Sequence, residues 1–458
     1  MAFSLRQLLD DQASRRVDLH RRHANHQLVR VLQLTGFDVD YAHASGSWLT
    51  DHDGNRYLDL LSGFGVFALG RNHPTVKAAL SEALAMDLPH LVQLDAPLPA
   101  GLLAERLCEL AGPGIERCFF GNSGAEAVET AIKLSRRVTG KPRILHADNA
   151  FHGLTTGALA LNGGDDFRAG FGALLDTTAV LYGDLDALER ELRRGDVAAF
   201  VVEPIQGKSV EVATGGYLRA ARDLCHERGA LFVVDEVQTG IGRTGAMFAY
   251  QHADVVPDIV TVAKALSGGF VPVGATLCRD DVWQATWSSV DRALVHSSTF
   301  GQSTLAMVAG LATLSVIEDE GLVDHAASTG VTLADGLREL QRRHEVISDV
   351  RGRGLMVGVE LDQPGRLGFR MLETVRPGLF SQLVVGPLFN DHRIITQVAA
   401  DHVNLIKLLP PLVAAEPEVT YFLDALDDVL TRASKLGSST ARLGRDFARR
   451  ARPGSRKA

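Results

Sequence analysis

Short apolar runs alternate with stretches of helical periodicity between about His90 and Thr313. The runs are continuous, and most are rich in β-branched or aromatic residues, which is typical of strands covered on both faces. They are Cys118–Phe120, Arg143–His146, Ala198–Val202, Leu231–Val234 and Ile259–Val262, and helical periodicity occupies Glu105–Ala111, Ala125–Val138 and Leu218–Arg228. The pattern predicts an α/β fold with a mainly parallel sheet.

The two ends of the chain differ from this middle part. The first 45 residues are predicted to be mostly helical, and Trp48–Leu61 has the alternation of a hairpin that turns at Asp53-Gly54. A helix at Gly330–Arg343 and a strand at Leu355–Leu361 predict a separate α+β unit. We therefore expect an N-terminal helical segment (1–45), the first part of a small domain (46–90), a large domain (91–313), the rest of the small domain (314–431) and a tail (432–458).

Composition narrows the class of protein. The 458 residues are 46% hydrophobic and 22% charged, which is ordinary for a soluble globular protein of about two to three domains. Four cysteines are too few for a disulfide framework in a chain of this length, and they form no CxxC pair, so no structural zinc site is predicted and a reducing cytoplasm is expected. No secretory leader and no apolar run of about 18 residues is present, so secreted and membrane-spanning classes are set aside.

The net charge of −8 hides an asymmetry. Arg432–Ala458 holds nine basic residues against the single Asp446, so this tail carries +8 and the rest of the chain −16. We interpret the tail as a disordered, solubilising end. The alternative is a peripheral membrane contact, since apolar residues recur at near-helical spacing among the arginines: Leu436, Leu443, Phe447 and Ala451. Nucleic acid binding is not needed to explain this charge.

Three segments carry candidate chemistry. Gly121–Glu126 follows a strand and opens a helix, where free amides favour an anion such as phosphate; the alternative is a capping box from Ser123 to Glu126. Asp235 closes an apolar strand and could keep a heterocyclic nitrogen protonated, or act as a helix cap or metal ligand. Lys264 ends another apolar strand, where desolvation makes an amine nucleophilic; the alternative is a surface lysine.

Two further patterns are discounted. Gly240–Gly245 matches G-x-G-x-x-G, but Asp235–Thr239 separates it from the strand and the stretch after it is too short for the helix of a dinucleotide site. His20, His23 and His26 are near helical spacing at the N-terminus and are interpreted as a solvated helix face. No metal site is predicted.

In their order along the chain, the motifs resemble the class III (ω-type) pyridoxal phosphate aminotransferases, a fold type I family. The resemblance covers roughly Gly46 to Asp424 and rests on Gly121–Glu126, Phe151-His152-Gly153, Glu203-Pro204, Asp235–Gly240, Lys264 and His296–Gly301. It implies a large domain with a mainly parallel sheet of the seven-stranded type, a small α+β domain, pyridoxal 5′-phosphate as cofactor, and a homodimer with shared active sites.

The resemblance also implies roles for single residues. Lys264 would form the Schiff base with the cofactor, Asp235 would pair with the pyridinium nitrogen, and Gln238 would approach the ring 3-oxygen. The remaining cofactor-site positions are Ser123, Gly124 and Ala125 at the phosphate, Phe151 and His152 at the ring, and Thr299 at the phosphate of the neighbouring subunit. With the ring nitrogen protonated, Lys264 shuttles a proton and the amino group is transferred by ping-pong kinetics.

Substrate positions depart from part of the family. Ornithine and acetylornithine members usually carry Arg after the aromatic-His-Gly triplet, whereas this chain has Leu154. Glu203 matches the family's gating carboxylate, and Arg351 is a candidate for the carboxylate of a donor such as glutamate. Leu383–Phe389 and His392–Gln397 are similar to members that aminate terminal aldehydes derived from diamines or lipophilic natural products, including hopanoid side chains.

Three alternatives stay open at this point. The first is an acetylornithine or ornithine aminotransferase. The second is an aminomutase or decarboxylase of the same fold. The third is a cofactor-binding interaction protein without catalysis, against which the complete set Asp235, Gln238, Lys264 and Thr299 argues.

Overall fold

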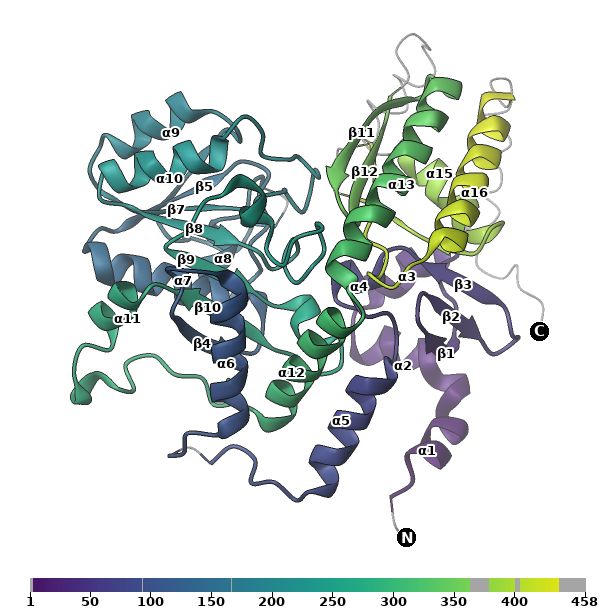
Figure 1. The fold of residues 1–458 in the computed structure, drawn as a ribbon. Coiled ribbons are helices and arrows are strands. Elements are labelled where there is room, and N and C mark those ends of the chain that lie inside the picture. The colour runs from purple at the N-terminus through teal and green to yellow at the C-terminus, as the bar shows by residue number, and fades with distance from the viewer. Residues whose placement is uncertain (1–2, 93, 166, 363–378, 400–403, 436–458) are drawn as a thin grey trace.

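The computed structural model describes residues 3–435 except 93, 166, 363–378 and 400–403. Two bodies lie side by side in it, a larger one with a broad sheet and a smaller one that carries both ends of the described chain (Figure 1). The predicted basic tail falls almost wholly outside the described residues.

The larger body is built on a seven-stranded sheet in the order β4-β10-β9-β8-β7-β5-β6. All neighbouring pairs from β9 to β6 are parallel, and only β10 runs antiparallel to its neighbours β4 and β9. The strands are β4 (Arg117–Gly121), β5 (Arg143–Ala147), β6 (Thr177–Val180), β7 (Val197–Val202), β8 (Leu231–Asp235), β9 (Ile259–Val262) and β10 (Gly274–Cys278). The expected α/β fold with a mainly parallel sheet is confirmed, and β6 and β10 are added to the predicted strands.

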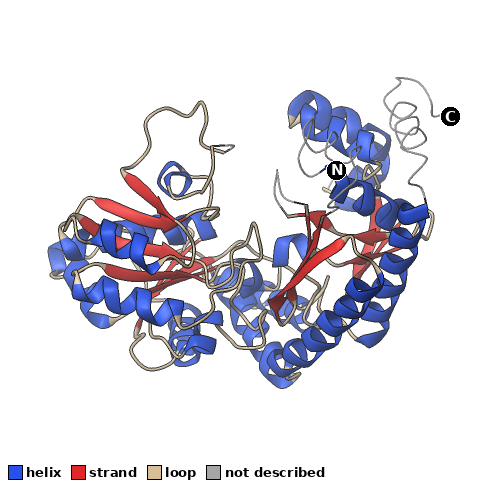
Figure 2. Ribbon diagram, turned by 90° about the horizontal axis from the view of Figure 1, so that it is seen from above, coloured by secondary structure: helices blue, strands red, loops and turns tan. Residues whose placement is uncertain are grey.

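Helices cover both faces of this sheet, which is why its central strands are continuous apolar runs (Figure 2). Every residue of β5, β7, β8 and β9 is buried. One face packs under α5 (Pro74–Ala85), α6 (Leu98–Ala111), α9 (Leu185–Leu192), α10 (Tyr217–Glu227) and α12 (Thr304–Asp319). The other face packs under α7 (Gly124–Thr139), α8 (Thr156–Ala160) and α11 (Asp280–Thr286).

The smaller body combines two sheets with three helices around a second core. One sheet, β11-β12-β15-β14, is antiparallel throughout; the other, β1-β2-β3-β13, ends in a parallel pair. Its elements are β1 (Tyr41–Ser45), β2 (Trp48–Asp51), β3 (Arg56–Asp59), β11 (Ile347–Arg353), β12 (Met356–Leu361), β13 (Ile394–Ile395), β14 (Gln397–Val398), β15 (Leu405–Leu408), α13 (Leu322–Arg343), α15 (Leu379–Asn390) and α16 (Glu416–Lys435). The predicted hairpin is the antiparallel pair β2–β3, in which Trp48 faces Leu58.

The structure divides the chain differently from the predicted segments at three places. Helices α1 (Leu5–Gln12), α2 (Arg16–His23) and α3 (His26–Thr35) end before β1, so 41–45 is a strand rather than part of the helical segment. Val76 of α5 is buried in the core of the larger body, although 46–90 was assigned to the small domain. The predicted boundary at 313 lies inside α12, because periodicity reveals a helix but not the core that it joins.

Four 3-10 turns and one short helix complete the described elements: Ala13–Arg15, Ala249–Ala253, Lys264–Ser267, Val290–Arg292 and α4 (Ser62–Gly65). No helix in the described part of the chain is both long and apolar enough to cross a membrane. His20, His23 and His26 are exposed, and the described residues contain no cluster with the composition of a metal site.

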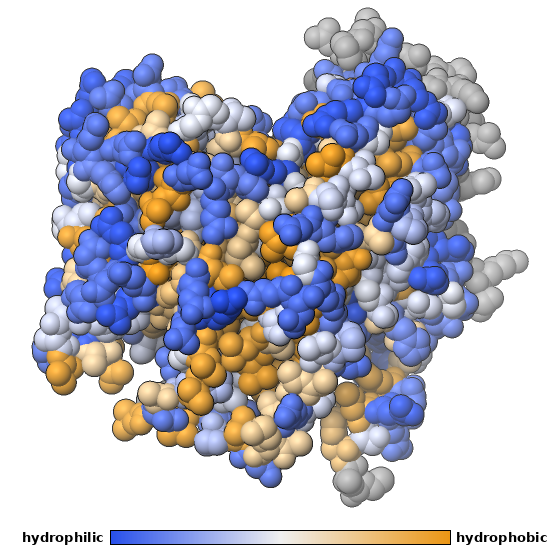
Figure 3. Space-filling model, in the orientation of Figure 1, coloured by the Kyte–Doolittle hydropathy of each residue, from blue (hydrophilic) through white to orange (hydrophobic). Residues whose placement is uncertain are grey.

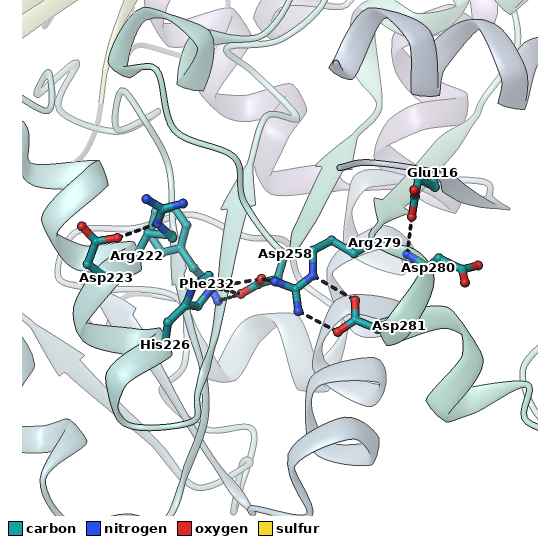
Figure 4. A network of polar contacts seen from close by, with 9 residues as sticks. All are labelled: Glu116, Arg222, Asp223, His226, Phe232, Asp258, Arg279, Asp280 and Asp281. Carbon is teal, nitrogen blue, oxygen red and sulfur yellow. Dashed lines mark hydrogen bonds and ion pairs between the residues drawn. The ribbon is translucent and has the colours of Figure 1, made fainter. Parts of the chain in front are cut away.

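A buried ion-pair network stabilises the sheet at the edge away from the strands' carboxyl ends (Figure 4). Asp258, immediately before β9, is fully buried and accepts a hydrogen bond from Phe232 N at 2.6 Å. Its carboxylate also lies 3.0 Å from His226 Nε2 and 2.5 Å from Arg279 Nη1. These partners offset the cost of burying the charge and join α10, β8, β9 and the end of β10.

Candidate active site

Polar side chains gather where the parallel strands end. Asp235 is the last residue of β8, Glu203 follows β7, and Lys264 comes two residues after β9. His152 lies in the loop after β5. Carboxyl ends of parallel strands share one edge, which is where open α/β sheets bind ligands. All four residues line one cavity of about 1490 Å³.

The turn before α7 lines the same cavity and has the features that favour an anion. Ser123 caps the 16-residue helix by accepting a hydrogen bond from Glu126 N at 3.1 Å. Asn122, Ser123, Gly124 and Ala125 all line the cavity, with the positive end of the helix behind them. A Cβ at Gly124 would lie 2.8 Å from Val237 Cγ1, so glycine allows the close approach.

The capping-box alternative holds only in part. Ser123 does cap the helix, but the Glu126 carboxylate accepts from Asn122 N at 2.7 Å and from Asn122 Nδ2 at 2.9 Å. Both side chains therefore stabilise the turn, and neither role competes with anion binding by the helix amides.

Asp235 is held by three donors. His152 Nδ1 lies 2.6 Å from Oδ2, while Val237 N and Thr261 Oγ1 each donate to Oδ1 at 3.0 Å. Burial disfavours a charged His152, but the hydrogen bond and charge of Asp235, with the charge of Glu203, outweigh it and raise the pKa of His152. The contacts fix an oriented carboxylate at the end of β8.

Lys264 occupies an unusual backbone conformation beside these carboxylates. Its φ of 42° is in the left-handed region, which non-glycine residues adopt mostly where the surrounding structure imposes it, often at functional sites. Desolvation lowers the pKa of Lys264, although the charges of Asp235 and Glu203 oppose that shift. A desolvated amine at the floor of a cavity is suited to nucleophilic attack and proton transfer.

Glu203 and Gln238 meet at Gly207. Glu203 Oε1 accepts from Gly207 N at 2.9 Å and Oε2 from Phe151 N at 3.2 Å. Burial raises the pKa of Glu203, while the nearby His152 lowers it in part. Gln238 Nε2 donates to Phe64 O at 3.1 Å. A Cβ at Gly207 would lie within about 3 Å of both side chains, so a glycine there lets them converge.

A second lysine, absent from the predicted site, enters the cavity from the smaller body. Lys407 of β15 is buried and donates to Gly207 O at 2.6 Å, with Gln238 Oε1 at 3.5 Å. Desolvation and then the charge of Lys264 lower its pKa to about 7. Among the described residues, no ion pair joins Lys407 to a carboxylate. A lone lysine in the apolar run Leu405–Leu409 was the signal that could have revealed it.

Three residues singled out from the sequence do not line the cavity. Thr299 is exposed in the segment before α12. Leu154 is 57% exposed. Arg351 is bound by Asp349 and Glu360 and donates from Nε to Ser209 O at 3.0 Å, so its guanidinium is already paired. Its use by a co-substrate carboxylate stays a prediction.

The chemistry of these residues fits pyridoxal phosphate. The α7 amides suit a phosphate, the oriented carboxylate of Asp235 suits a protonated ring nitrogen, and Lys264 supplies an amine. Phe151, which lines the cavity, supplies an aromatic face.

Comparison with protein families matches residues 33–430 to aminotransferase class III. The chain belongs to this family. It is therefore a pyridoxal phosphate-dependent aminotransferase, as its sequence predicted. Acetylornithine aminotransferase from Mycobacterium tuberculosis (strain ATCC 25618 / H37Rv) is 42% identical over 398 residues, which are 86% of this chain and 92% of that relative. Aminotransferase PigE from Serratia sp. (strain ATCC 39006) is 35% identical over 455 residues, 91% of this chain; the chain spans only 53% of that relative's length.

Solved structures are similar over nearly the whole aminotransferase. A transaminase from the marine bacterium Virgibacillus has a TM-score of 0.84 at 26% identity, covering 92% of this chain and 99% of that one. The ornithine aminotransferase from Toxoplasma gondii, described with pyridoxal phosphate at its active site, has a TM-score of 0.78 at 31% identity, covering 87% and 91%.

Proposed function

We propose that this aminotransferase moves an amino group between a carboxylate-bearing donor, such as glutamate or ornithine, and a terminal aldehyde. The acceptor is a diamine-derived or lipophilic aldehyde of the kind expected from the sequence, including hopanoid-like side chains. The observation that carries the proposal is that the cavity has a charged inner end and an apolar outer part. Its inner end holds Lys264, Lys407 and Glu203, and its outer part is lined by apolar side chains such as Val31, Phe64 and Phe167.

The inner residues have separate tasks. Pyridoxal phosphate, when bound, supplies the electron sink that stabilises negative charge on the substrate carbon next to nitrogen. Asp235, oriented by His152 and Thr261, holds the proton on the ring nitrogen. The freed amine of Lys264 moves the proton at the reacting carbon, which its desolvation favours.

Other residues position the cofactor and exclude water. Ser123, Gly124 and Ala125 bind the phosphate through the start of α7, Phe151 covers the ring, and Gln238 faces its 3-oxygen. Glu203 gates the substrate side, as the family resemblance implies. Their placement around one cavity supports these assignments.

Lys407 is assigned to the carboxylate of the amino donor. It is a buried cation held by a carbonyl and an amide oxygen, so a substrate carboxylate would be its first ionic partner in the described structure. Arg351 already has three carboxylate partners, Glu211, Asp349 and Glu360, which makes it the poorer candidate. An uncharged terminal aldehyde does not need such a contact.

The dimer is also a proposal. Figure 3 shows apolar side chains gathered on the lower part of one face, over α5, α6 and α12. Exposed apolar residues there include Leu84, Met86, Leu98 and Leu102. Thr299 is exposed outside its own cavity, as expected if it contacts the neighbouring subunit's cofactor. A sedimentation-equilibrium mass of a single chain would exclude this arrangement.

A half-reaction screen tests the proposed function. The cofactor-loaded enzyme is titrated with glutamate, ornithine, acetylornithine, putrescine and hexylamine, and cofactor absorbance is followed after each addition. Conversion by glutamate or ornithine and by a terminal amine is expected. Failure of every terminal amine, with glutamate active, would refute the acceptor class.

The second candidate is an acetylornithine aminotransferase, favoured by the 42% identity to such enzymes. Acetylornithine carries an α-carboxylate at the other end of the chain from its reacting terminal amine, and Lys407 could bind that carboxylate. Faster conversion by acetylornithine than by hexylamine in the same screen would establish this alternative.

A further inference from the structure

Helix α3 forms one wall of the active-site cavity, although it lies far in sequence from every residue at the inner end. Val31, Leu34 and Thr35 of this helix line the cavity. Their spacing of three and four residues places them on one face. The Thr35 hydroxyl donates to Val31 O at 2.9 Å and lies 3.2 Å from Leu32 O, so it is engaged within the helix. The wall that α3 contributes is therefore hydrocarbon.

This wall is anchored at both ends. Asn25 caps α3 by accepting from the backbone amides of Gln27 and Leu28, both at 3.1 Å. Just after the helix, the Phe37 ring packs edge-on against Phe389 of α15, with centroids 4.3 Å apart. These contacts attach α3 to the smaller body, while Lys264 belongs to the larger one, so the cavity lies between the two.

The facing wall carries aromatic rings beside two charged residues, Asp165 and Lys208. Phe151 and Phe167 pack edge-to-face with centroids 5.6 Å apart, and both line the cavity with Phe64. Val31 is 52% exposed, Phe64 47% and Phe167 38%, so much of this hydrocarbon faces solvent at the cavity's outer part. An aliphatic chain lying there would remove apolar surface from water on both sides.

We propose that Val31 and Leu34 of α3 set the length of the carbon chain that the enzyme accepts, selecting an unbranched aliphatic amine or aldehyde that fills the apolar part of the cavity. The inference rests on the proposed function, because it concerns the chain attached to the terminal amine. The amine enters at Lys264 and its nitrogen is transferred to the cofactor, with water supplying the oxygen of the aldehyde. The chain then lies between α3 and the phenylalanine wall.

The test is the half-reaction of the full-length, cofactor-loaded enzyme with straight-chain primary amines from butylamine to decylamine. We expect the second-order rate constant to rise about fourfold per methylene until the cavity is filled. Leu34→Trp should lower the decylamine constant by tenfold or more and leave butylamine within twofold. Leu34→Ala, which keeps the helix and enlarges the cavity, should move the optimum to longer chains.

The matched control is Gln33→Trp, on the same helix at an exposed position that does not line the cavity. The chain-length profile of Gln33→Trp should match that of the wild type. A second readout is calorimetric binding of decan-1-ol, which cannot react and should bind Leu34→Trp at least tenfold more weakly.

Two results would overturn the inference. They are a flat chain-length profile in the wild type and an identical profile in Leu34→Trp. The glutamate half-reaction distinguishes a failure of this inference from a failure of the proposed function. An intact glutamate half-reaction with a flat but measurable amine profile removes this inference alone, whereas failure of every amine with glutamate active removes the proposed acceptor class.

Discussion

The inner and outer parts of the cavity are built by different means. The inner part stands at the carboxyl ends of fully buried strands, where each charged group has defined partners, such as the three donors on Asp235. The outer part combines a half-exposed face of α3 with three phenylalanine rings, beside the charged residues Asp165 and Lys208. Reaction chemistry needs fixed charges in a low dielectric, whereas chain recognition needs only surface that can be covered. Substitutions in the inner part should therefore affect the reaction, and substitutions in the outer part should affect chain recognition.

The largest effect is expected at the inner part. Lys264→Ala removes the amine that holds the cofactor and moves the proton, so the rate of the glutamate half-reaction should fall by about 10⁴-fold. Stopped-flow absorbance measures the rate, and the visible spectrum should lose the band of the lysine-bound cofactor. An unchanged spectrum would refute the role of Lys264.

The next effect concerns the scaffold that holds the inner part. Asp258→Asn breaks a buried ion-pair network at the opposite edge of the sheet, and the free energy of unfolding should fall by about 3 kcal/mol. Urea denaturation measures it. The rate per folded molecule should stay within twofold, since Asp258 does not line the cavity. A large loss of rate at full folding would mean that the two edges of the sheet are coupled.

Substitutions at Lys407 should affect glutamate and alkylamines differently. Lys407→Met should raise the apparent Kd of glutamate about 10–100-fold through loss of a charge-assisted contact, with alkylamines unaffected. Lys407→Arg should restore glutamate binding. Equal losses for both substrates in Lys407→Met would contradict a carboxylate role.

The pH dependence of glutamate affinity also tests the role of Lys407. Because the pKa of Lys407 is lowered to about 7, its ammonium form is present below that pH and is lost as the pH rises through it. Glutamate affinity should therefore decrease above about pH 7 in the wild type and stay flat in Lys407→Arg. Lys264 and Glu203 titrate nearby and are common to both variants, so the difference between the two profiles isolates Lys407. Parallel profiles would contradict the assignment.

The smallest effect is expected for Arg351→Gln. Its guanidinium is paired outside the cavity, so the apparent Kd of glutamate should change by less than about twofold. Titration of the cofactor absorbance compares it directly with Lys407→Met. A larger effect than that of Lys407→Met would return the carboxylate site to Arg351.

Residues that stand at strand ends were predictable. Asp235 and Lys264 each follow an apolar run, and that local pattern places them at the reacting edge of a parallel sheet. Lys407 was missed because its neighbours in sequence are apolar and its partners, Gly207 and Gln238, are about 170 to 200 positions away. Domain boundaries were missed at α5 and α12 because a helix pattern does not identify its core.

By itself, the sequence determined the α/β class, the order of the central strands along the chain and the chemistry of the reacting end. These follow from local patterns: burial on both faces makes a strand continuously apolar, and polar groups for catalysis follow where it ends. Only the tertiary structure decided that α3 walls the cavity, that Lys407 enters it and that Arg351 is paired elsewhere. The first two facts depend on contacts between segments far apart in the sequence, which the packing of two bodies brings together. The third depends on the pairing of β11 with β12, which places Glu360 beside Arg351.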